Sequence, residues 1–314
     1  MTIDTLYKKI ALLSPYAEVI LRKLYWHNVV WLNRFRPQER KTDALATETR
    51  PFDFEKIIAF IKENGVKEGS LLLVHSSYDM LKGAGLKPNE IISRLREIIG
   101  ENGTLAMPVI RRYKDYPQPE EWLKTDFSTV ECTYDPKKTP IISGLLPSML
   151  LREKDSVVSL HPLNTLAAVG PLAQQMMEHN IDGDKPTPHG PNSSWKFCAD
   201  HNAIILALGV NMAHHLTIAH VAEDCFEDWP FQDWYNDLRF NILLPDNTVK
   251  KIVVRERKPC WGLFHDAELN QEKELHQAGL IVSTEINGIP ISMMHSESLI
   301  SFMKNHKHKG FPYY

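Results

Sequence analysis

The apolar positions between residues 50 and 110 alternate between two spacings. Over residues 52–64 and again over residues 88–99, apolar side chains recur every three or four residues, which predicts two helices with one buried face each. The segments 70–75 and 103–108 are instead short and almost continuously apolar, which is typical of strands buried on both faces. Helices that alternate with buried strands predict an α/β fold.

The rest of the chain extends this alternation and then changes character. Residues 202–210 form the clearest buried strand, and a turn rich in Asn and His leads from it into a predicted helix around His220. Residues 241–254 hold two strands on either side of an Asp-Asn turn, which predicts a hairpin. Short helices are predicted over residues 272–278 and 296–305.

Composition narrows the class of protein. The chain has 314 residues, 43% hydrophobic and 24% charged, as in ordinary soluble globular proteins, so neither a disordered chain nor a membrane-spanning bundle is expected. No window approaches the roughly 18 consecutive apolar residues of a spanning helix, and the first residues lack the features of a signal peptide. The formal net charge of −3 argues against a nucleic-acid partner. The four cysteines are scattered without a CxxC pair, which predicts a cytoplasmic protein in a reducing compartment.

The first 50 residues differ from the rest. They hold nine Lys and Arg against five Asp and Glu, a net charge of +4, so residues 51–314 carry −7. Within them, Leu21, Leu24 and Trp31 follow a helical spacing between basic side chains. We therefore predict a basic helical N-terminal extension over residues 1–50 and one main domain over residues 51–314. The extension is expected either to pack on the domain or on a dimer partner, or to contact an anionic membrane surface.

The densest group of reactive side chains follows the predicted strand at 202–210. On a helix, Thr217, His220 and Glu223 fall within one arc of about 120°. His220 and Glu223 are three residues apart, close enough for the carboxylate to hold an imidazole N–H. A histidine oriented in this way is a competent general base near neutral pH, and the end of a strand in an α/β sheet is where such sites lie. The alternative interpretation is a solvated pair on a helix surface.

Two other kinds of site fit these residues less well. His214, His215, His220 and Glu223 could be metal ligands, but there is no HExxH motif, and the spacing from His215 to His220 places those side chains about 140° apart on a helix. The serines in the segment 75–85 suggest a serine hydrolase, but the chain has no GxSxG elbow. That segment is better explained as a turn after a strand, either an ordinary loop or one whose hydroxyl and backbone N–H groups hold ligand oxygens.

Seven segments, taken in chain order, resemble the aminoglycoside 3-N-acetyltransferase family. They include Val-His-Ser-Ser at the end of the strand at 70–75 and Thr-x-x-His-x-x-Glu after the strand at 202–210, and residues 1–50 lie outside them. The segments are residues 74–77, 103–108, 134–144, 159–162, 167–170, 190–193 and 208–223. The resemblance implies a layered α/β/α fold with a central mixed sheet, of the non-GNAT acetyltransferase type.

The resemblance also implies a chemistry. It indicates an acetyl-CoA-dependent N-acetyltransferase that needs no metal, with an amine of a sugar or aminocyclitol as the small-molecule acceptor. His220 would remove the amine proton, Glu223 would orient His220, and Thr217 would bond the developing oxyanion or the sulfur. The residues implied in donor binding are His75, Ser76, Ser77, Tyr78, Asp79, Thr139, Ser143 and His161. Since both substrates would be bound together, the cysteines need no catalytic role.

Several positions depart from the family pattern. Leu216 stands where drug-modifying members commonly have Asn, Trp195 stands where Pro is common, and Thr165 stands where Ser is frequent. A polycationic acceptor calls for an acidic cleft, and the −7 carried by residues 51–314 is only mildly acidic. We therefore expect an amino sugar, for example a nucleotide-linked one for surface polysaccharide. The alternatives are an aminoglycoside antibiotic and, from another class, a metal-dependent amidohydrolase. A homodimer is compatible with the sequence.

Overall fold

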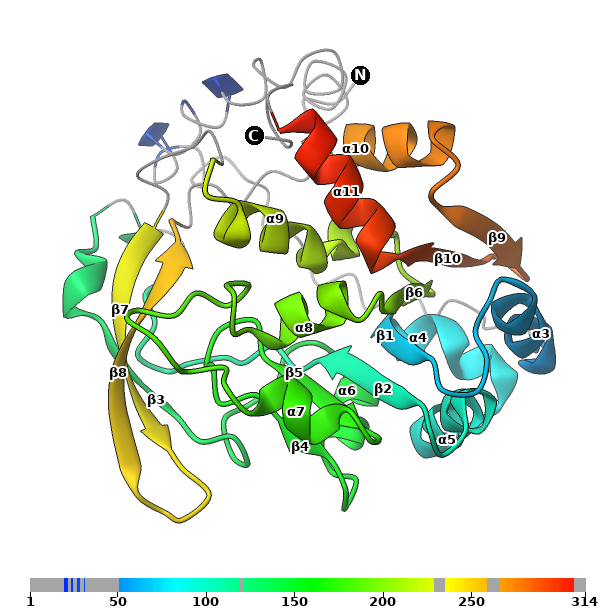
Figure 1. Cartoon of the computed structure of the whole chain (residues 1–314), viewed down its shortest axis with the longest axis horizontal. Helices are drawn as coiled ribbons and strands as arrows, with labels where there is room; N and C mark the ends of the chain where they lie inside the picture. Colours follow the sequence, from blue (N-terminus) through cyan, green and yellow to red (C-terminus); the bar gives the residue numbers. More distant parts are fainter. Residues whose placement is uncertain are drawn as a thin grey trace.

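The computed structural model describes most of the chain from residue 51 onward (Figure 1). The described ranges are 51–118, 121–122, 124–228, 235–258 and 266–307, with six residues before them: Ile20, Leu21, Leu24, His27, Asn28 and Trp31. These six are helical, but the rest of the predicted extension over residues 1–50 lies outside the described residues. The predicted boundary at residue 50 therefore stays a prediction. Within the described part of the chain, no helix is both long enough and apolar enough to cross a membrane.

A mixed sheet of seven strands forms the centre of the fold, in the order β4-β5-β2-β1-β6-β10-β9. β1 pairs in parallel with β2 and β6, and the other pairings in this sheet are antiparallel. The strands are β1 (Leu71–Ser76), β2 (Thr104–Pro108), β4 (Val157–Val158), β5 (Leu166–Val169), β6 (Ile204–Leu208), β9 (Val282–Ile286) and β10 (Ile289–His295). The predicted strands at 70–75, 103–108 and 202–210 are thus three neighbours at its centre, and the predicted mixed sheet is confirmed.

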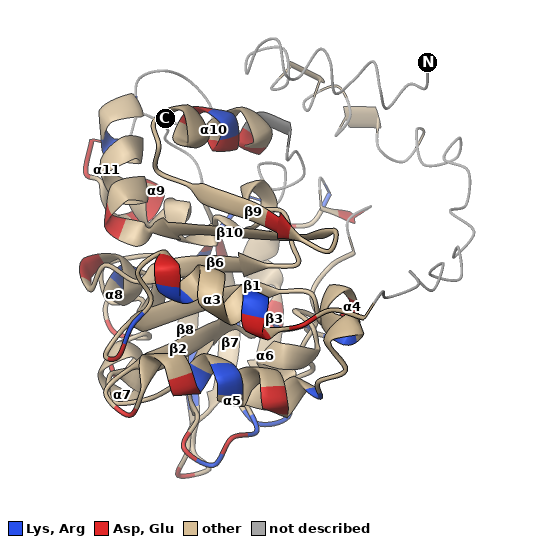
Figure 2. Cartoon of the chain, turned by 90° about the vertical axis from the view of Figure 1, so that its right-hand side faces the viewer, with Lys and Arg blue, Asp and Glu red and all other residues tan. Residues whose placement is uncertain are grey.

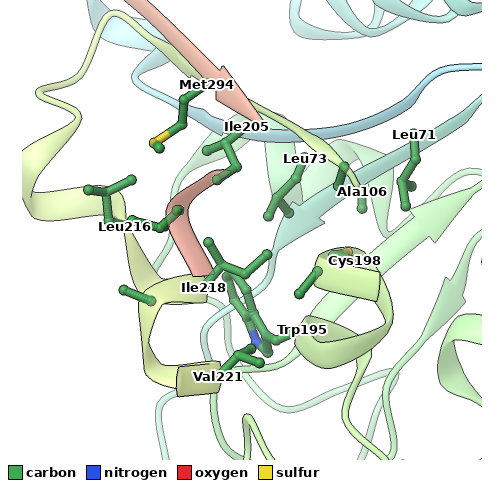
Figure 3. Close-up of a cluster of buried hydrophobic side chains, with 14 of the residues drawn as sticks. Leu71, Leu73, Ala106, Trp195, Cys198, Ile205, Leu216, Ile218, Val221 and Met294 are labelled. Carbon is green, nitrogen blue, oxygen red and sulfur yellow. The ribbon is translucent and has the colours of Figure 1, made fainter. Parts of the chain in front are cut away.

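Helices cover both faces of this sheet because its central strands alternate between two apolar cores. Leu72 and Val74 of β1 face one core, and Leu71 and Leu73 face the other. The first core is covered by α3 (Glu55–Glu63), α4 (Tyr78–Leu81), α5 (Pro88–Ile99) and α6 (Leu145–Leu150). The second, part of which is shown in Figure 3, is covered by α7 (Ala173–Met177), α8 (Ser194–Asp200), α9 (His220–Cys225), α10 (Asp266–Gln277) and α11 (Ser296–His306). These layers confirm the predicted α/β/α architecture.

Local sequence sets both the ends of the helices and the placement of charge. α5 begins with Pro88 at its first position, where no backbone N–H is needed, and the Glu90 carboxylate accepts the Lys87 backbone N–H at 2.5 Å. The central strands β1, β2, β5 and β6 contain no Lys, Arg, Asp or Glu, whereas α3 and α5 carry charges on their outer sides (Figure 2). The charged side chains are therefore kept out of the buried sheet.

A second, smaller sheet lies beside the first, at the left of Figure 1, and has the order β3-β7-β8. Its strands are β3 (Glu131–Tyr134), β7 (Tyr235–Leu243) and β8 (Val249–Arg257). β7 and β8 pair over their whole length as an antiparallel hairpin, which confirms the hairpin predicted around 241–254. Aromatic and aliphatic side chains on its inner face, among them Tyr134 and Phe240, form a separate core. This sheet delivers the end of β8 to the site described below.

Several elements differ from the sequence prediction, and three of them are instructive. The predicted helix after β6 is preceded by a separate 3-10 turn, Ala213–His215, which ends at Leu216 with the non-helical angles φ −83° and ψ 42°. The helix itself begins as a 3-10 turn at Thr217–Ala219 and runs directly into α9 at His220, so Thr217 and His220 lie on one continuous helical segment. The β9–β10 hairpin was not predicted, although Asn287 and Gly288 both have positive φ, as their two-residue turn requires. The predicted helix at 272–278 is the end of the longer α10.

Candidate active site

The site lies where the segment after β6 approaches the turn after β1. Gly209 follows β6 with φ +71°, and a Cβ placed on it would lie 2.9 Å from Met80 Cβ and 3.4 Å from the Ser77 carbonyl oxygen. A larger residue would push these two segments apart. The close approach brings the start of α9, and with it His220, to the end of the sheet that carries the carboxyl ends of β1 and β6.

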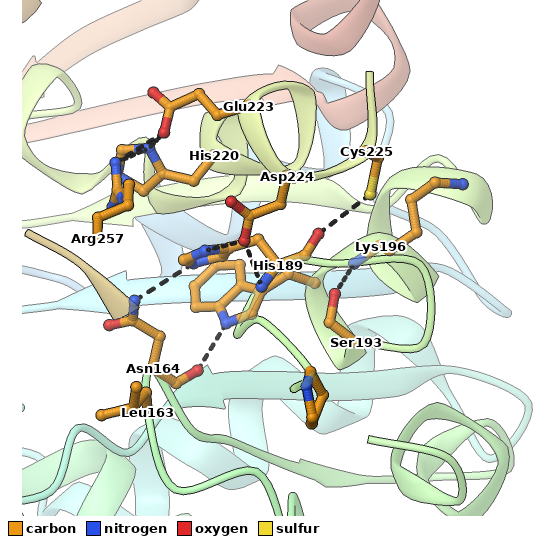
Figure 4. A network of polar contacts seen from close by, with 12 residues as sticks. Leu163, Asn164, His189, Ser193, Lys196, His220, Glu223, Asp224, Cys225 and Arg257 are labelled. Atoms are coloured by element: carbon orange, nitrogen blue, oxygen red, sulfur yellow. Dashed lines mark hydrogen bonds and ion pairs between the residues drawn. The ribbon is translucent and has the colours of Figure 1, made fainter. Parts of the chain in front are cut away.

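His220 and Glu223 form the predicted pair. His220 Nδ1 lies 2.9 Å from Glu223 Oε2, with about a quarter of the histidine side chain exposed and the carboxylate buried (Figure 4). Burial alone would raise the pKa of Glu223, but the contacts with His220 and with the Arg257 guanidinium outweigh it and lower that pKa. Glu223 is therefore a carboxylate at neutral pH, able to hold the imidazole and to stabilise its protonated form.

Arg257, the last residue of β8, completes this group. Its Nη1 lies 2.8 Å from Glu223 Oε2 and 2.6 Å from His220 Nδ1. The guanidinium comes from the second sheet, whereas His220 and Glu223 lie on α9, which covers the central sheet (Figure 4). The site is therefore assembled from elements that are far apart in the sequence. Sequence reasoning missed Arg257, because nothing local in the segment around it signals a contact with a residue 37 positions earlier.

A second histidine and carboxylate lie behind the first. His189 Nδ1 is 3.6 Å from Asp224 Oδ2, and both side chains are buried. Asp224 also accepts the His189 backbone N–H at 3.2 Å and the Tyr235 hydroxyl. Burial would raise the pKa of Asp224, but the contacts with His189 and Tyr235 outweigh it, so the pKa is lowered. Burial lowers the pKa of His189, so this pair is a charged carboxylate beside a neutral imidazole.

A series of rings connects His220 with the end of β1. The His220 ring lies 5.2 Å from that of His189, which lies 5.6 Å from Trp195. Trp195 lies 6.2 Å from His75, and His75 lies 5.6 Å from His215. Burial, with a smaller contribution from His215, lowers the pKa of His75 to about 3. His75 is thus a neutral ring packed between the predicted base and the predicted donor turn.

The predicted donor-binding residues after β1 have different environments. The Ser76 hydroxyl is buried and has no hydrogen-bond partner among the described residues. Ser77 precedes α4 as its cap residue, and the Tyr78 hydroxyl donates to the Leu86 carbonyl at 3.1 Å. Asp79 is exposed and pairs with Lys82 at 2.5 Å. Ser76 therefore has an unused buried polar group, as does the neighbouring His75, whose Nε2 is also buried without a hydrogen-bond partner among the described residues.

The other predicted donor-binding residues stabilise loops near the same sheet edge. Thr139 Oγ1 accepts the Asp135 N–H at 2.9 Å, and Ser143 Oγ accepts the Ile110 N–H at 3.1 Å while donating to the Pro108 carbonyl at 2.7 Å. A Cβ on Gly144 would lie 4.0 Å from the Ser76 carbonyl oxygen, so this loop lies against the end of β1.

Neither His161 nor Thr217 forms a hydrogen bond with His220 or Glu223 among the described residues. The ring nitrogens of His161 contact the backbone carbonyl oxygen of Pro186 and the backbone of Leu163, each at 3.2 Å. Burial lowers the pKa of His161, so the ring is neutral and held by backbone groups on both sides. In the described part of the chain, the Thr217 side chain forms no hydrogen bond with His220 or Glu223.

Known proteins share this architecture. A sequence model for the family described as aminoglycoside 3-N-acetyltransferase matches residues 73–306, from β1 to the last turn of α11. The chain belongs to this family. The match contains every site residue named above, and it confirms the resemblance inferred from the seven segments.

Individual members of the aminoglycoside 3-N-acetyltransferase family are distant relatives of this chain. Aminoglycoside N(3)-acetyltransferase IX of Micromonospora chalcea is 28% identical over 166 residues, which cover 51% of this chain and 57% of that protein. Aminoglycoside N(3)-acetyltransferase IV of a Salmonella species is 29% identical over 227 residues, covering 71% and 77%. The alignment thus spans little more than half of the first of these relatives.

Solved structures of the family confirm the fold. Aminoglycoside acetyltransferase AAC(3)-IIb has a TM-score of 0.66 at 23% identity, with 84% of this chain and 100% of that chain covered. AAC-IIIb, solved as a binary complex with CoASH, has a TM-score of 0.65 at 20% identity, covering 83% and 98%.

Within this family fold, the sequence pattern predicted the histidine–glutamate pair of the site but not the other polar residues that contact it or lie behind it. It predicted His220 and Glu223 but not Arg257, His189, Asp224 or Tyr235. Two of these had a usable signal, since Asp224 follows Glu223 and His189 directly precedes the segment 190–193 of the resemblance. As for a metal centre, no three His, Cys, Asp or Glu side chains in the described ranges converge on one point.

Proposed function

We propose that the protein transfers the acetyl group of acetyl-CoA to an amine of an aminoglycoside-type acceptor, a sugar or an aminocyclitol. The observation that carries this proposal is the 2.9 Å contact between His220 and Glu223 inside the matched family region. The names of the relatives support it, and so does the CoASH held by the AAC-IIIb neighbour. An aminoglycoside acceptor is supported by the AAC(3)-IVa neighbour solved with apramycin.

An ammonium has no lone pair, so the acceptor must first give one proton to solvent and react as the neutral amine. As its nitrogen forms the C–N bond to the acetyl carbonyl carbon, it loses a second proton, which His220 Nε2 accepts. The C–S bond then breaks, and His220 returns the proton to the departing CoA sulfur. Glu223 stabilises the imidazolium between these events through Nδ1. Proton transfer by a positioned base such as His220 is typically worth about 10²–10⁴-fold in rate.

Donor binding is proposed for the turn after β1 and the loop against it. The buried, unpartnered Ser76 hydroxyl is placed to bond a polar group of the pantetheine arm, beside the residues proposed with it: His75, Ser77, Tyr78, Asp79, Thr139 and Ser143. His161 is proposed to act by holding the loop at Pro186, because backbone groups occupy both ring nitrogens. Thr217 is proposed to face the reacting carbonyl from the 3-10 turn that precedes His220.

A second acceptor class is an amino sugar linked to a nucleotide, of the kind used to build surface polysaccharide. The observation that favours it is Arg257, whose guanidinium adds positive charge directly beside the proposed base. A polycationic aminoglycoside would meet this charge, whereas an acceptor with phosphate groups would not be repelled.

The test is thiol release from acetyl-CoA with a panel that contains apramycin, gentamicin and a uridine-diphosphate amino sugar. We expect release with at least one amine and a mass gain of one acetyl group on that acceptor. His220→Ala should lower kcat by about 10²–10⁴-fold with little change in the KM for acetyl-CoA. His201→Ala, which removes a ring stacked on Phe197 away from the site, is the matched control. Absence of release with every amine, or full activity of His220→Ala, would overturn the proposal.

A further inference from the structure

Arg257 and Glu223 both contact Nδ1 of His220, and a single imidazole nitrogen cannot satisfy both contacts together. Its Nη1 is 2.6 Å from His220 Nδ1, and Glu223 Oε2 is 2.9 Å from the same nitrogen. A guanidinium can only donate, so its bond to Nδ1 requires a lone pair there. A carboxylate can only accept, so its bond to Nδ1 requires a proton there. The third contact, from Arg257 to Glu223 at 2.8 Å, is satisfied in either case.

The two arrangements leave different chemistry at the other ring nitrogen. When Arg257 donates to Nδ1, a neutral His220 carries its proton on Nε2 and cannot accept another there. When Arg257 donates to Glu223 alone, Nδ1–H bonds the carboxylate and the Nε2 lone pair is free to accept a proton. The contact of 2.6 Å, shorter than the 2.9 Å contact with Glu223, favours the first arrangement in the substrate-free protein.

We propose that Arg257 is a positioning residue that sets which nitrogen of His220 carries the proton. In the substrate-free protein it holds the Nε2–H tautomer and opposes the imidazolium, and the base becomes competent when the guanidinium donates to Glu223 alone. The catalytic part of this proposal rests on the proposed role of His220 as base, whereas the tautomer itself does not depend on any activity.

The charged and titratable groups around the ring come from three elements. Glu223 lies on the same helix, α9, Arg257 lies at the end of β8, and His189 faces the ring from the loop before α8, with Asp224 behind it. His189 is buried and neutral, so Glu223 and Arg257 are the two charges in direct contact with His220 among the described residues. Removing Arg257 leaves a carboxylate as the charged partner of the imidazole, and this favours its protonation.

Arg255 offers a matched control on the same strand. It lies two residues before Arg257, so both side chains leave the same face of β8. Its Nε is 3.7 Å from Asp237 Oδ1, and about half of the side chain is exposed. Arg255→Gln therefore removes an equal charge from the same strand without removing a contact to His220.

The decisive experiment is ¹⁵N NMR of the imidazole nitrogens at a pH where the histidines are neutral, with His220 assigned from the His220→Ala spectrum. We expect Nε2–H in the wild-type protein and Nδ1–H in Arg257→Gln, with Arg255→Gln matching the wild type. A wild-type protein with the proton on Nδ1 would overturn the proposal, and this result needs neither activity nor a folded Arg257 variant.

The kinetic consequence is a shift in pH dependence. In Arg257→Gln, the acidic limb of the kcat/KM profile should move to higher pH by about one unit, because the imidazolium is no longer opposed by a neighbouring cation. Arg257→Lys keeps the positive charge and should restore at least half of the shift. The KM for acetyl-CoA should change less than twofold in both variants. Superimposable profiles for Arg257→Gln and the wild type would contradict the positioning role, while thiol release by the wild type would still support the proposed function.

Discussion

Two histidine–carboxylate pairs lie side by side in this protein, and their carboxylates are consecutive residues. His220 with Glu223 is partly open to solvent, and His189 with Asp224 is buried. The first carboxylate is shared with a cation from another sheet, and the second with the Tyr235 hydroxyl and a backbone N–H. Both pairs have the same chemical groups, so their different surroundings must decide their roles. The partial exposure of the His220 side chain suits the proposed proton transfer, whereas burial suits His189 to hold the loop before α8 in place.

A change at Glu223 should have a larger effect on activity than a change at the other carboxylate of the two histidine–carboxylate pairs. Glu223→Gln keeps the side-chain shape and removes the charge that stabilises the imidazolium, so kcat should fall by roughly 10²-fold. The melting temperature should fall, because Arg257 loses its counter-ion, but less than in Asp224→Asn, since the amide oxygen still accepts from a guanidinium that is partly exposed. Steady-state kinetics and a melting curve measure the two effects. A variant with wild-type kcat would show that the carboxylate takes no part in the reaction.

The buried pair should show the reverse pattern. Asp224→Asn removes a charged acceptor for His189 and Tyr235, and we expect a loss of about 2 kcal/mol in the free energy of unfolding, with kcat reduced less than tenfold. Asp182→Asn, which removes an exposed partner of His179, should cost less than about 0.5 kcal/mol and serves as the control. A fall in kcat as large as that of Glu223→Gln would break the distinction between the pairs.

Acid should remove the contribution of Asp224 in a defined window. Its pKa is lowered to about 2 in the folded protein, against about 3.9 in the unfolded chain. A group with a depressed folded pKa stabilises the protein above its unfolded pKa and loses this contribution as the pH falls through the folded pKa. The difference in unfolding free energy between wild type and Asp224→Asn should therefore be constant above about pH 5 and shrink between about pH 4 and 2. A difference that does not change with pH would mean that the carboxylate is not charged when folded.

Tyr235 gives the smallest expected effect. Tyr235→Phe removes the hydroxyl that donates to Asp224 and should cost about 1 kcal/mol of stability, with kcat within threefold of the wild type. Urea unfolding and steady-state kinetics on the same preparation measure both. A loss of activity without a loss of stability would place this hydroxyl with the reacting groups instead.

The sequence predicted the elements and contacts formed by residues close together in the chain. It did not predict contacts between residues that only the packing of distant elements brings together. The central strands and the helices α3 and α5 could be predicted because their apolar spacing is continuous over each element. His220 and Glu223 could be paired because they are three residues apart. Arg257 and His189 are 37 and 31 residues from His220, and their contacts with it depend on how β8 and the loop before α8 dock on α9.

The start of α9 shows a different limit of the sequence. Helical spacing of Thr217, His220 and Glu223 was a sound argument for His220 and Glu223, which lie in the α-helix. It did not give the local geometry at Thr217, which lies in a 3-10 turn that begins after the non-helical Leu216 and runs into α9. The spacing of polar side chains does not distinguish such a turn from the first turn of an α-helix.

The β7–β8 hairpin makes strand register a determinant of the site. Glu256 and Arg257 are neighbours on β8 and face opposite sides, with Glu256 bonded to the Tyr116 hydroxyl at 2.6 Å and Arg257 at His220. A slip of one residue in one direction would exchange the faces and present an acid to His220 where the cation now lies. The turn that fixes this register is some ten residues away, where Asp246 accepts the Thr248 N–H at 3.0 Å. A single insertion at that surface turn would therefore place Glu256 beside the proposed base and reverse the sign of the charge there, whereas a single deletion would place Lys258 there and keep it.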